Sequence, residues 1–493
     1  MQVATVMPQR VQTWWDGFLA KRGRPLTTGD ITVVKPPELK RATAAASVGN
    51  CMEWYDFGVF SYLTATIGAV FYPSGNPVAQ LLASFATFSV AFLVRPLGGL
   101  FFGPLGDRIG RTKVLAATMV LMAVGTFAIG FIPSYASIGI AAPILLLLAR
   151  MLQGFSTGGE YGGASTFTAE YAPDRRRGYF CSFLDFGTFI GYAIGSGVVT
   201  LMTLALSETA MLSWGWRIPF LVAGPLGLIG LYIRLKLEDT PAYQQQEEAV
   251  EAAEPPVAHP IRTTVRDHWR PLLVCMGLVL LYNVTNYMVT AYLPTYLTQE
   301  LGQRAHIADM FILAAMVLVV VTITFIGRAS DRYGRKVTFN IGAVGLVVLA
   351  LPCFWMMRAG GVVLPLAGVL VLALLLAFFA GTSAATLPAL FPTRIRYTAM
   401  AVGFNISVAA FGGTTPLVTE ALVAWSGDLM VPAYYLMAAG AIGLIAIAYL
   451  PETAGLPLAG AQPQVVSSGE ARELVMVTRE YFTRLLPPRR KLA

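Results

Sequence analysis

Long apolar segments alternate with short polar connections along almost the whole chain. About twelve of these segments approach the ~20 residues that a helix needs to cross a membrane. They lie near 42–68, 81–104, 114–132, 138–163, 179–205, 218–233, 271–297, 310–327, 338–357, 362–390, 398–425 and 430–450. The pattern predicts an all-α membrane protein with twelve transmembrane helices. Because the number of crossings is even, we expect both termini on the same side of the membrane.

Positive charge is concentrated in every second connection and in both tails. Of the 35 Lys and Arg residues, 30 lie on this side, whereas the opposite loops hold Arg217, Arg304 and Arg358. Basic loops remain in the cytoplasm. The asymmetry therefore predicts a multi-pass protein of the cell inner (plasma) membrane with both termini cytoplasmic.

The composition excludes several other classes of protein. Hydrophobic residues make up 56% of the chain and charged residues 13%, whereas a soluble domain has ~25% charged residues. The net charge of +8 is spread over loops and tails, so we expect no nucleic-acid partner. The three histidines lie in loops and the four cysteines in apolar segments without CxxC spacing. They predict neither a metal site nor a disulfide framework. No signal peptide is expected, since the first apolar segment begins after residue 40.

The two halves of the chain repeat each other around a polar stretch at 236–269. GDRIGR at 106–111 follows the second segment, and SDRYGR at 330–335 follows the eighth. Transporters often contain such repeats, with the substrate site where the halves meet. We expect two pseudo-symmetric six-helix bundles at 42–235 and 271–450, joined by a cytoplasmic loop at 236–270.

The tails, 1–41 and 451–493, give weaker signals. Val11, Trp14, Trp15, Phe18 and Leu19 have helical spacing and precede basic residues. This spacing is typical of an amphipathic helix on anionic lipids, and equally of a disordered tail with a chance stripe. Residues 469–486 can form one short helix, which is too short for a coiled coil.

Charged groups inside the apolar segments are expensive and usually functional. Glu53 lies about 16 Å from the cytoplasmic start of its helix, where it suits either a proton site or an ion pair with Arg95 or Arg150. Arg95 suits either a substrate carboxylate or neutralisation of Glu53 or Asp56. We expect Glu420 to be a water-exposed cap. The proton-coupling candidates are Glu53, Asp56, Glu160 and Asp185.

Aromatic and amide side chains share faces of the first and seventh segments. Together they can form a cage that favours quaternary ammonium cations, although an aromatic belt at the membrane interface is the alternative. The substrate-binding candidates are Arg95, Asn50, Trp54, Tyr55, Asn283, Asn286 and Tyr287. In addition, glycines at four-residue spacing, at 154, 158 and 162 and at 187, 191 and 195, predict close helix packing.

Charged connections on the basic side predict a cytoplasmic gate that forms in one conformational state. Asp107 and Arg111 are expected to bond across to neighbouring helix ends. Glu170 and Arg177 can do the same between the fourth and fifth helices, and Asp331 and Arg335 repeat this in the second half. The candidates are Gly106, Asp107, Arg108, Gly110, Arg111, Glu170, Arg177, Asp331, Arg332, Gly334 and Arg335.

Several of these motifs resemble those of a known family. The two loop motifs and RMLQGFSTGGEYGG at 150–163 resemble the major facilitator superfamily. GNCMEWYDFGVFSYL at 49–63, AEYAPDRRRG at 169–178 and WGWRIPF at 214–220 resemble its metabolite–proton symporters, and within them the proline/glycine-betaine branch. The resemblance covers roughly residues 30–460. It implies two six-helix bundles, alternating access and proton-coupled uptake, with the proton as coupling ion and no cofactor.

We therefore expect a symporter, not an enzyme, that takes up a small zwitterion such as proline, glycine betaine or ectoine. The first alternative is proton symport of a carboxylate metabolite such as 2-oxoglutarate, citrate or shikimate, which would require more cationic groups in the cavity. An exporter and a non-transporting membrane sensor are the remaining alternatives. The family match opposes the exporter, and the lack of an attached signalling domain opposes the sensor.

Overall fold

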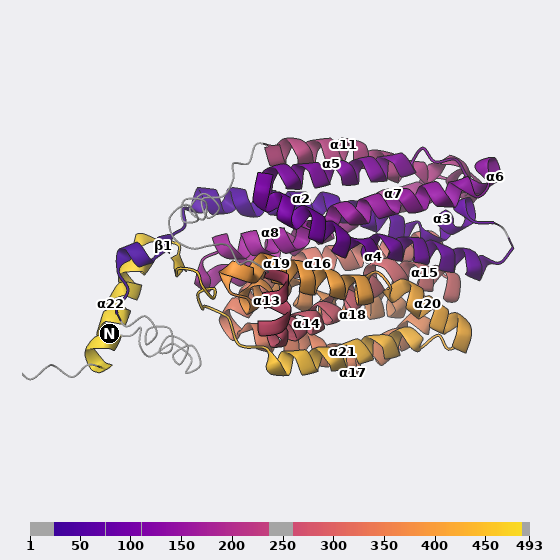
Figure 1. Ribbon diagram of the computed structural model, residues 1–493. Coiled ribbons are helices and arrows are strands. Elements are labelled where there is room, and N and C mark those ends of the chain that lie inside the picture. Colours follow the sequence, from indigo (N-terminus) through magenta and orange to yellow (C-terminus); the bar gives the residue numbers. More distant parts are fainter. Residues whose placement is uncertain (1–23, 74, 110, 236–259, 486–493) are drawn as a thin grey trace, which may run out of the picture.

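The computed structural model describes residues 24–73, 75–109, 111–235 and 260–485. Most helices run along one common direction, and the described parts of both tails gather at one end of the bundle (Figure 1). We call this end the basic end, because it holds the connections around Arg177, Arg335 and Arg396. The other end is called the opposite end.

Each expected apolar segment corresponds to a helical segment. Nine helices in the described ranges are long and apolar enough to cross a membrane, and two shorter apolar helices lie at Ala117–Ile129 and Arg217–Ile229. The remaining expected segment, 42–68, lies in α2 and α3. The main helices of the first half are α2 (Pro36–Tyr62), α3 (Thr64–Phe71), α4 (Pro77–Ile109), α5 (Arg111–Ile129), α7 (Ala141–Thr157), α8 (Glu160–Tyr171), α9 (Arg177–Ala205) and α11 (Arg217–Leu235).

The second half contains wider helical turns that the sequence pattern did not predict. π turns at η4 (Met288–Tyr292), η5 (Tyr296–Glu300) and η7 (Val408–Gly412) interrupt two of its long helical segments. Such turns are frequent at functional sites. Its helices are α13 (Pro260–Asp267), α14 (Trp269–Tyr287), α15 (Leu293–Thr295), α16 (Ala305–Tyr333), α17 (Arg335–Arg358), α18 (Val363–Thr386), α19 (Thr393–Ser407), α20 (Thr415–Ser426) and α21 (Val431–Tyr449).

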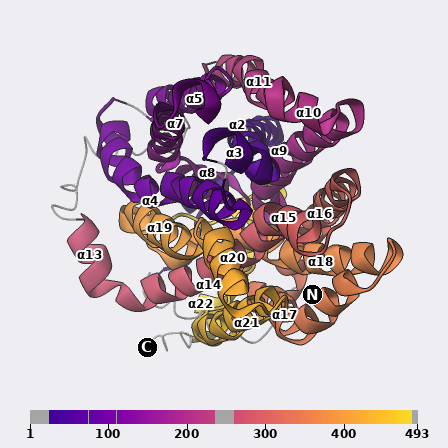
Figure 2. The ribbon, with the colours of Figure 1, turned by 90° about the vertical axis from the view of Figure 1, so that its right-hand side faces the viewer.

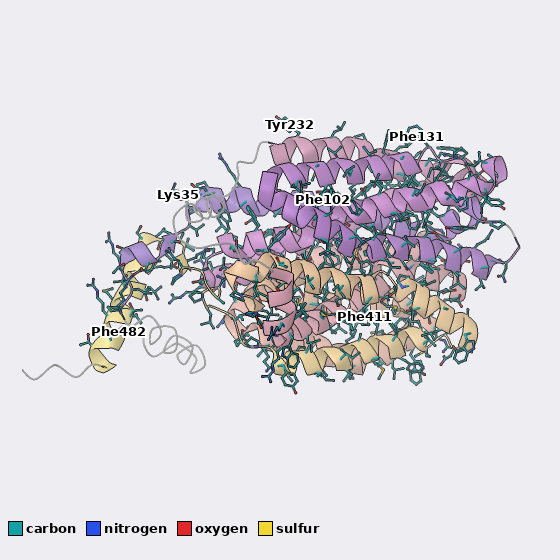
Figure 3. The ribbon with its side chains drawn as sticks, viewed as in Figure 1. Lys35, Phe102, Phe131, Tyr232, Phe411 and Phe482 are labelled. Atoms are coloured by element: carbon teal, nitrogen blue, oxygen red, sulfur yellow. The ribbon has the colours of Figure 1, made fainter. Side chains whose placement is uncertain are left out.

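The two halves lie side by side, and α9 of the first half packs along α16 of the second (Figure 2). The outer surface is apolar: Phe131 and Phe411, among others, project from it (Figure 3). Large exposed apolar side chains are expected on a surface that faces lipid. Charged groups such as Arg95 and Glu160 are buried instead.

Glycines permit the closest helix crossings, as the spacing predicted. A Cβ at Gly158 would lie 2.1 Å from the Arg95 carbonyl oxygen, so α7 and α4 touch through their backbones. A Cβ at Gly187 would similarly lie 2.0 Å from the Ser47 oxygen, between α9 and α2. The crossing at Gly158 fixes the depth of Arg95. Gly162, by contrast, has its nearest neighbour at 3.7 Å and is not needed for close approach.

The tails meet at the basic end. Strand β1 (Thr32–Val33) pairs in parallel with β2 (Gln464–Val465), and α22 (Ser468–Leu485) packs against Leu26 and Ile31. The expected C-terminal helix is confirmed as α22. The stripe at 11–19 lies outside the described residues.

Candidate functional site

A buried ion pair lies at the centre of the first half. Arg95 Nη2 on α4 donates to Glu53 Oε1 on α2 at 2.9 Å, and both side chains are almost fully buried. The Arg95 guanidinium also lies 5.8 Å from the ring centre of Trp54 and 5.5 Å from that of Phe92. Among the described residues, its Nε and Nη1 have no hydrogen-bond partner. Arg95 therefore holds a carboxylate and retains unused donors.

A second polar chain connects Asp56 to Arg150. Thr126 Oγ1 donates to Asp56 Oδ2 at 2.6 Å, Gln153 Nε2 donates to Thr126 Oγ1 at 2.5 Å, and Arg150 Nη1 donates to Gln153 Oε1 at 2.7 Å. Within the described part of the chain, Arg150 Nε and Nη2 lack hydrogen-bond partners. The guanidinium is covered by phenyl rings, with Phe60 nearest at 4.3 Å. Asp56 and Arg150 are thus linked through neutral groups rather than paired directly.

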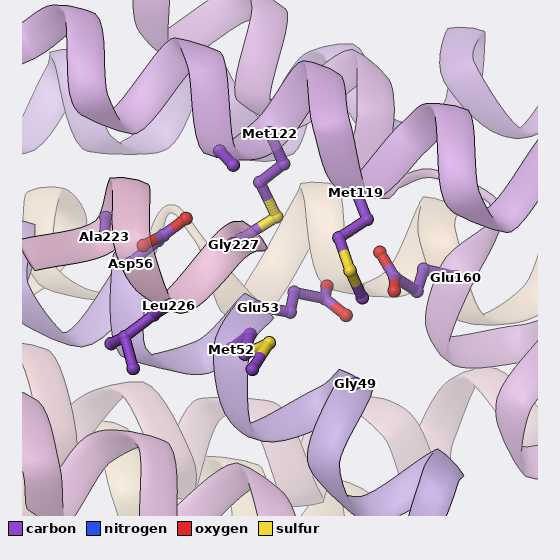
Figure 4. A pocket seen from close by; sticks show the side chains of 11 residues that line it. Gly49, Met52, Glu53, Asp56, Met119, Met122, Glu160, Ala223, Leu226 and Gly227 are labelled. Atoms are coloured by element: carbon purple, nitrogen blue, oxygen red, sulfur yellow. The ribbon is translucent and has the colours of Figure 1, made fainter. Parts of the chain in front are cut away.

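Three of the four proton-coupling candidates line one cavity. Glu53 and Asp56 reach it from α2 and Glu160 from α8, beside Met119 and Met122 of α5. Figure 4 shows the Glu53 and Glu160 carboxyl groups turned into the same space. All three carboxyl residues are buried. A cavity between carboxyl groups within one half can hold water or a proton without opening the interface between the halves.

Some, but not all, of the aromatic substrate-binding candidates lie in contact with one another. Trp54 lies 6.2 Å from Tyr287 and 5.6 Å from Tyr192, measured between ring centres, so the two halves share an aromatic cluster. Asn50 Oδ1 accepts a hydrogen bond from Trp54 Nε1 at 3.1 Å and fixes that ring. Tyr55 turns elsewhere, because its hydroxyl donates to Pro219 O on α11, within the first half.

The π turns shape the second half of this cluster. A Cβ at Gly412 in η7 would lie 2.8 Å from the Tyr287 ring, so the glycine gives this ring its space. The Tyr287 hydroxyl and Asn286 Oδ1 are buried and have no hydrogen-bond partner among the described residues. Asn283, in contrast, donates to Val279 O of its own helix at 2.9 Å. Tyr287 and Asn286 thus remain available to a ligand.

Asp185 joins the halves at mid-depth. The Tyr282 hydroxyl of α14 donates to Asp185 Oδ1 at 2.9 Å, and the Tyr161 hydroxyl of α8 donates to Asp185 Oδ2 at 3.1 Å. The Tyr161 ring stacks on Phe404 of α19, with centres 4.3 Å apart. Asp185 is therefore part of the contact between the halves rather than of the carboxyl cavity.

Asp331 closes the basic end. Its carboxylate accepts from the backbone N–H groups of Gly178 and Tyr179, each at 2.8 Å, at the start of α9. It also pairs with Arg335 Nη2 at 2.7 Å. Gly334, with φ of 104°, separates α16 from α17 at this point, and Arg332 faces outward.

Glu170 and Arg177 have different partners at the basic end. Glu170 Oε1 instead accepts from Arg396 Nη1 of the other half at 2.6 Å, and Arg177 pairs with Asp174. Glu170 therefore connects the two halves, which a pairing with Arg177 would not do. The remaining gate candidates lie outside the part of the chain whose side chains the structure describes; they are Gly106, Asp107, Arg108, Gly110 and Arg111.

Two acidic residues at the opposite end are buried: Glu420, for which the prediction was wrong, and Asp309, for which none was made. Glu420 is buried, not water-exposed, and accepts from the Tyr292 hydroxyl at 3.1 Å. Asp309 of α16, which lies just before an apolar segment in the sequence, accepts from Thr203 Oγ1 of α9 at 3.1 Å. The sequence analysis did not single out Asp309, and only the packing of α9 reveals that it is buried.

Known proteins are similar to this chain in sequence or in fold. The sequence profile of the Major Facilitator Superfamily matches residues 46–414. The chain is 48% identical to the proline/betaine transporter of Salmonella typhimurium over 92% of both chains. It is also 48% identical to the glycine betaine/proline/ectoine/pipecolic acid transporter of Dickeya dadantii, with the same coverage. The solved structure of a proton:xylose symporter bound to 6-bromo-6-deoxy-D-glucose matches with a TM-score of 0.69 at 18% identity, over 86% of this chain and 98% of that one.

Proposed function

The chain belongs to the major facilitator superfamily, within the group of the proline/betaine transporters, and we propose that it takes up a small zwitterionic osmolyte together with a proton. Proline, glycine betaine and ectoine are the substrates we propose, because each combines a carboxylate with a cationic nitrogen. The protein is a multi-pass membrane transporter. We propose the cell inner membrane as its location, with the basic end and both termini in the cytoplasm.

The observation that carries this proposal is the ion pair of Arg95 and Glu53 beside the aromatic cluster. A protonated Glu53 no longer holds the Arg95 guanidinium by charge. Arg95 is then able to bind a substrate carboxylate bidentately. The cationic nitrogen of the substrate would face Trp54 and Tyr287, since aromatic rings attract such cations. In this scheme the proton and the substrate carboxylate bind together because both act on the same ion pair.

The carboxyl cavity suits the proton side of the cycle. Glu160 and Asp56 line the same space as Glu53, so a proton can be handed between carboxyl groups there. Asp185 accepts a hydrogen bond from Tyr282 of the other half. Protonation of Asp185 would therefore change a contact between the two halves. We propose two bundles, 42–235 and 271–450, that rock around this centre.

The alternative substrate is a carboxylate metabolite. The unused nitrogen donors of both Arg95 and Arg150 favour it, because two cations suit a dianion better than a zwitterion. Arg150 is, however, enclosed by phenyl rings of α2 and α4, whereas Arg95 lies beside the aromatic cluster shared by both halves.

Uptake into proteoliposomes tests the proposal. Labelled glycine betaine, proline and 2-oxoglutarate are supplied with and without an inward proton gradient. Gradient-driven accumulation of betaine or proline supports the osmolyte symporter. Accumulation of 2-oxoglutarate alone supports the alternative. Equal uptake with and without the proton gradient rejects proton coupling.

A further inference from the structure

Helices α9 and α16 pack along each other between the halves, and α16 contributes a carboxylate at each end of this contact. Asp331 closes the basic end through two backbone N–H groups of α9. Asp309 lies at the opposite end, where its Oδ2 accepts from Thr203 Oγ1 at 3.1 Å. Its backbone oxygen also accepts from Ser196 Oγ at 3.5 Å. Both ends of this contact are therefore closed in the same structure.

The two ends are held by different chemistry. Asp331 accepts from two N–H groups at a helix N-terminus and pairs with one guanidinium, and such charge-assisted hydrogen bonds are strong. Among the described residues, the Asp309 side chain accepts one hydrogen bond, from the hydroxyl of Thr203, which also donates to Thr200 O of its own helix at 3.0 Å. With one shared donor against three, Asp309 is the more weakly held of the two carboxylates.

A purely structural role explains Asp309 only in part. Asp309 lies near the N-terminus of α16, where the helix dipole favours a carboxylate. That effect does not require burial, yet Asp309 is 8% exposed. Burying a carboxylate is costly unless it is hydrogen-bonded. Its side-chain donor, Thr203, lies in the other half of the protein, so the bond exists only while this end is closed.

We infer that Asp309 is a positioning residue of the transport cycle, a latch with Thr203 that closes the opposite end over bound substrate. The inference rests on the proposed transport by alternating access. The Asp309–Thr203 bond breaks to admit substrate and re-forms before the basic end opens. Because the Asp309 carboxylate has one donor on α9 and the Asp331 carboxylate has two, this latch yields before the contacts of Asp331 do.

Thiol labelling of the purified protein in nanodiscs tests the latch directly. In a background without the four native cysteines, Val199→Cys places a thiol on α9 between Ser196 and Thr203, at a buried position. Asp309→Ala and Thr203→Val each remove the bond, and each is expected to raise the labelling rate severalfold. Asp309→Asn retains an acceptor and is expected to label close to the parent rate.

Thr298→Val is the matched control. Thr298 lies near the same end, but its hydroxyl donates only within its own helical segment, to Pro294 O and Thr295 O. Unchanged labelling in both Asp309→Ala and Thr203→Val, or an equal rise in Thr298→Val, would overturn the latch. Thr203→Val keeps the test informative where Asp309→Ala folds poorly.

Transport kinetics provide the second measurement. Loss of the latch is expected to slow turnover of labelled betaine while its binding stays equal or becomes tighter, because the open state is favoured. A residue that only supports the fold would weaken binding and turnover together, and that result would reject the positioning role. The labelling assay needs no substrate. A failure of betaine uptake therefore counts against the proposed substrate and not against the latch.

Discussion

At the scale of single residues, the charged groups of the first half are organised as partners rather than as isolated sites. Glu53 holds Arg95, and Asp56 reaches Arg150 only through Thr126 and Gln153. Removing one member of a buried ion pair leaves the other uncompensated, at a cost of about 3–5 kcal/mol. Substitutions that keep a hydrogen-bond acceptor therefore separate the function of these groups from their contribution to stability.

Glu53→Gln is such a substitution. The amide oxygen can still accept from Arg95 Nη2, so we expect the free energy of unfolding to fall by only about 1–3 kcal/mol. The amide cannot carry a proton at this position. Gradient-driven accumulation is expected to be lost, while exchange of labelled for unlabelled substrate continues.

Glu38→Gln provides the control for that experiment. Glu38 is an exposed residue of the same helix, paired with Lys35 at the surface, and its neutralisation should leave accumulation unchanged. Normal accumulation in Glu53→Gln would remove Glu53 from proton coupling. Loss of both accumulation and exchange would instead indicate a damaged binding site.

At the scale of helices, backbone contact between α4 and α7 fixes the position of Arg95. A Cβ at Gly158 would lie 2.1 Å from the Arg95 oxygen and 2.5 Å from Gly99 N, both backbone atoms that cannot turn away. Gly158→Ala is therefore expected to destabilise the protein by about 1–3 kcal/mol or more. The midpoint of thermal unfolding in detergent measures this.

Gly162→Ala is the matched comparison, because its Cβ would meet nothing closer than 3.7 Å. It should fold and transport like the parent protein. Because alanine has a higher helix propensity than glycine, an equal loss of thermal stability in both variants would show that the crossing of α4 and α7 does not determine the result.

The helices were predictable because the membrane requires each of them to be apolar over its whole length. The motif glycines were predictable for a related reason, since their spacing is visible along a single helix. The π turns were not, because a change of hydrogen-bond register depends on what packs beside it. Which face of α2 meets the other half was likewise only partly predictable from the sequence. Trp54 and Tyr55 are neighbours in sequence, yet one meets Tyr287 of the other half and the other bonds to Pro219 of its own.

The candidate site shows the same limit. An ion pair was one of two interpretations for both Glu53 and Arg95, and several pairings satisfied the sequence equally well. Asp309 shows the reverse problem. A carboxylate at the edge of an apolar segment is normally exposed, and only the neighbouring helix of the other half shows otherwise.

At the scale of the whole molecule, the chain after α21 bridges the basic ends of both halves. Arg177 Nη1 of the first half donates to Leu456 O at 2.7 Å, and Arg396 Nη2 of the second donates to Ala459 O at 2.9 Å. Gln464 N then returns to Asp174 of the first half at 3.0 Å. Opening the basic end must stretch or break this bridge, so the bridge favours the closed state.

Truncation of the chain tests this bridge. Removing residues 457–493 deletes the bonds of Ala459 and Gln464, and we expect the basic end to open more often. A cysteine at Ser182, which is buried on α9 against Gly327 of α16, should then be labelled severalfold faster. Removing only 467–493 deletes α22 but keeps those bonds, and should leave the rate near that of the full chain. An equal rise in both truncations would assign the effect to α22, and no rise in either would show that the contacts of Asp331 and Glu170 hold the basic end without the bridge.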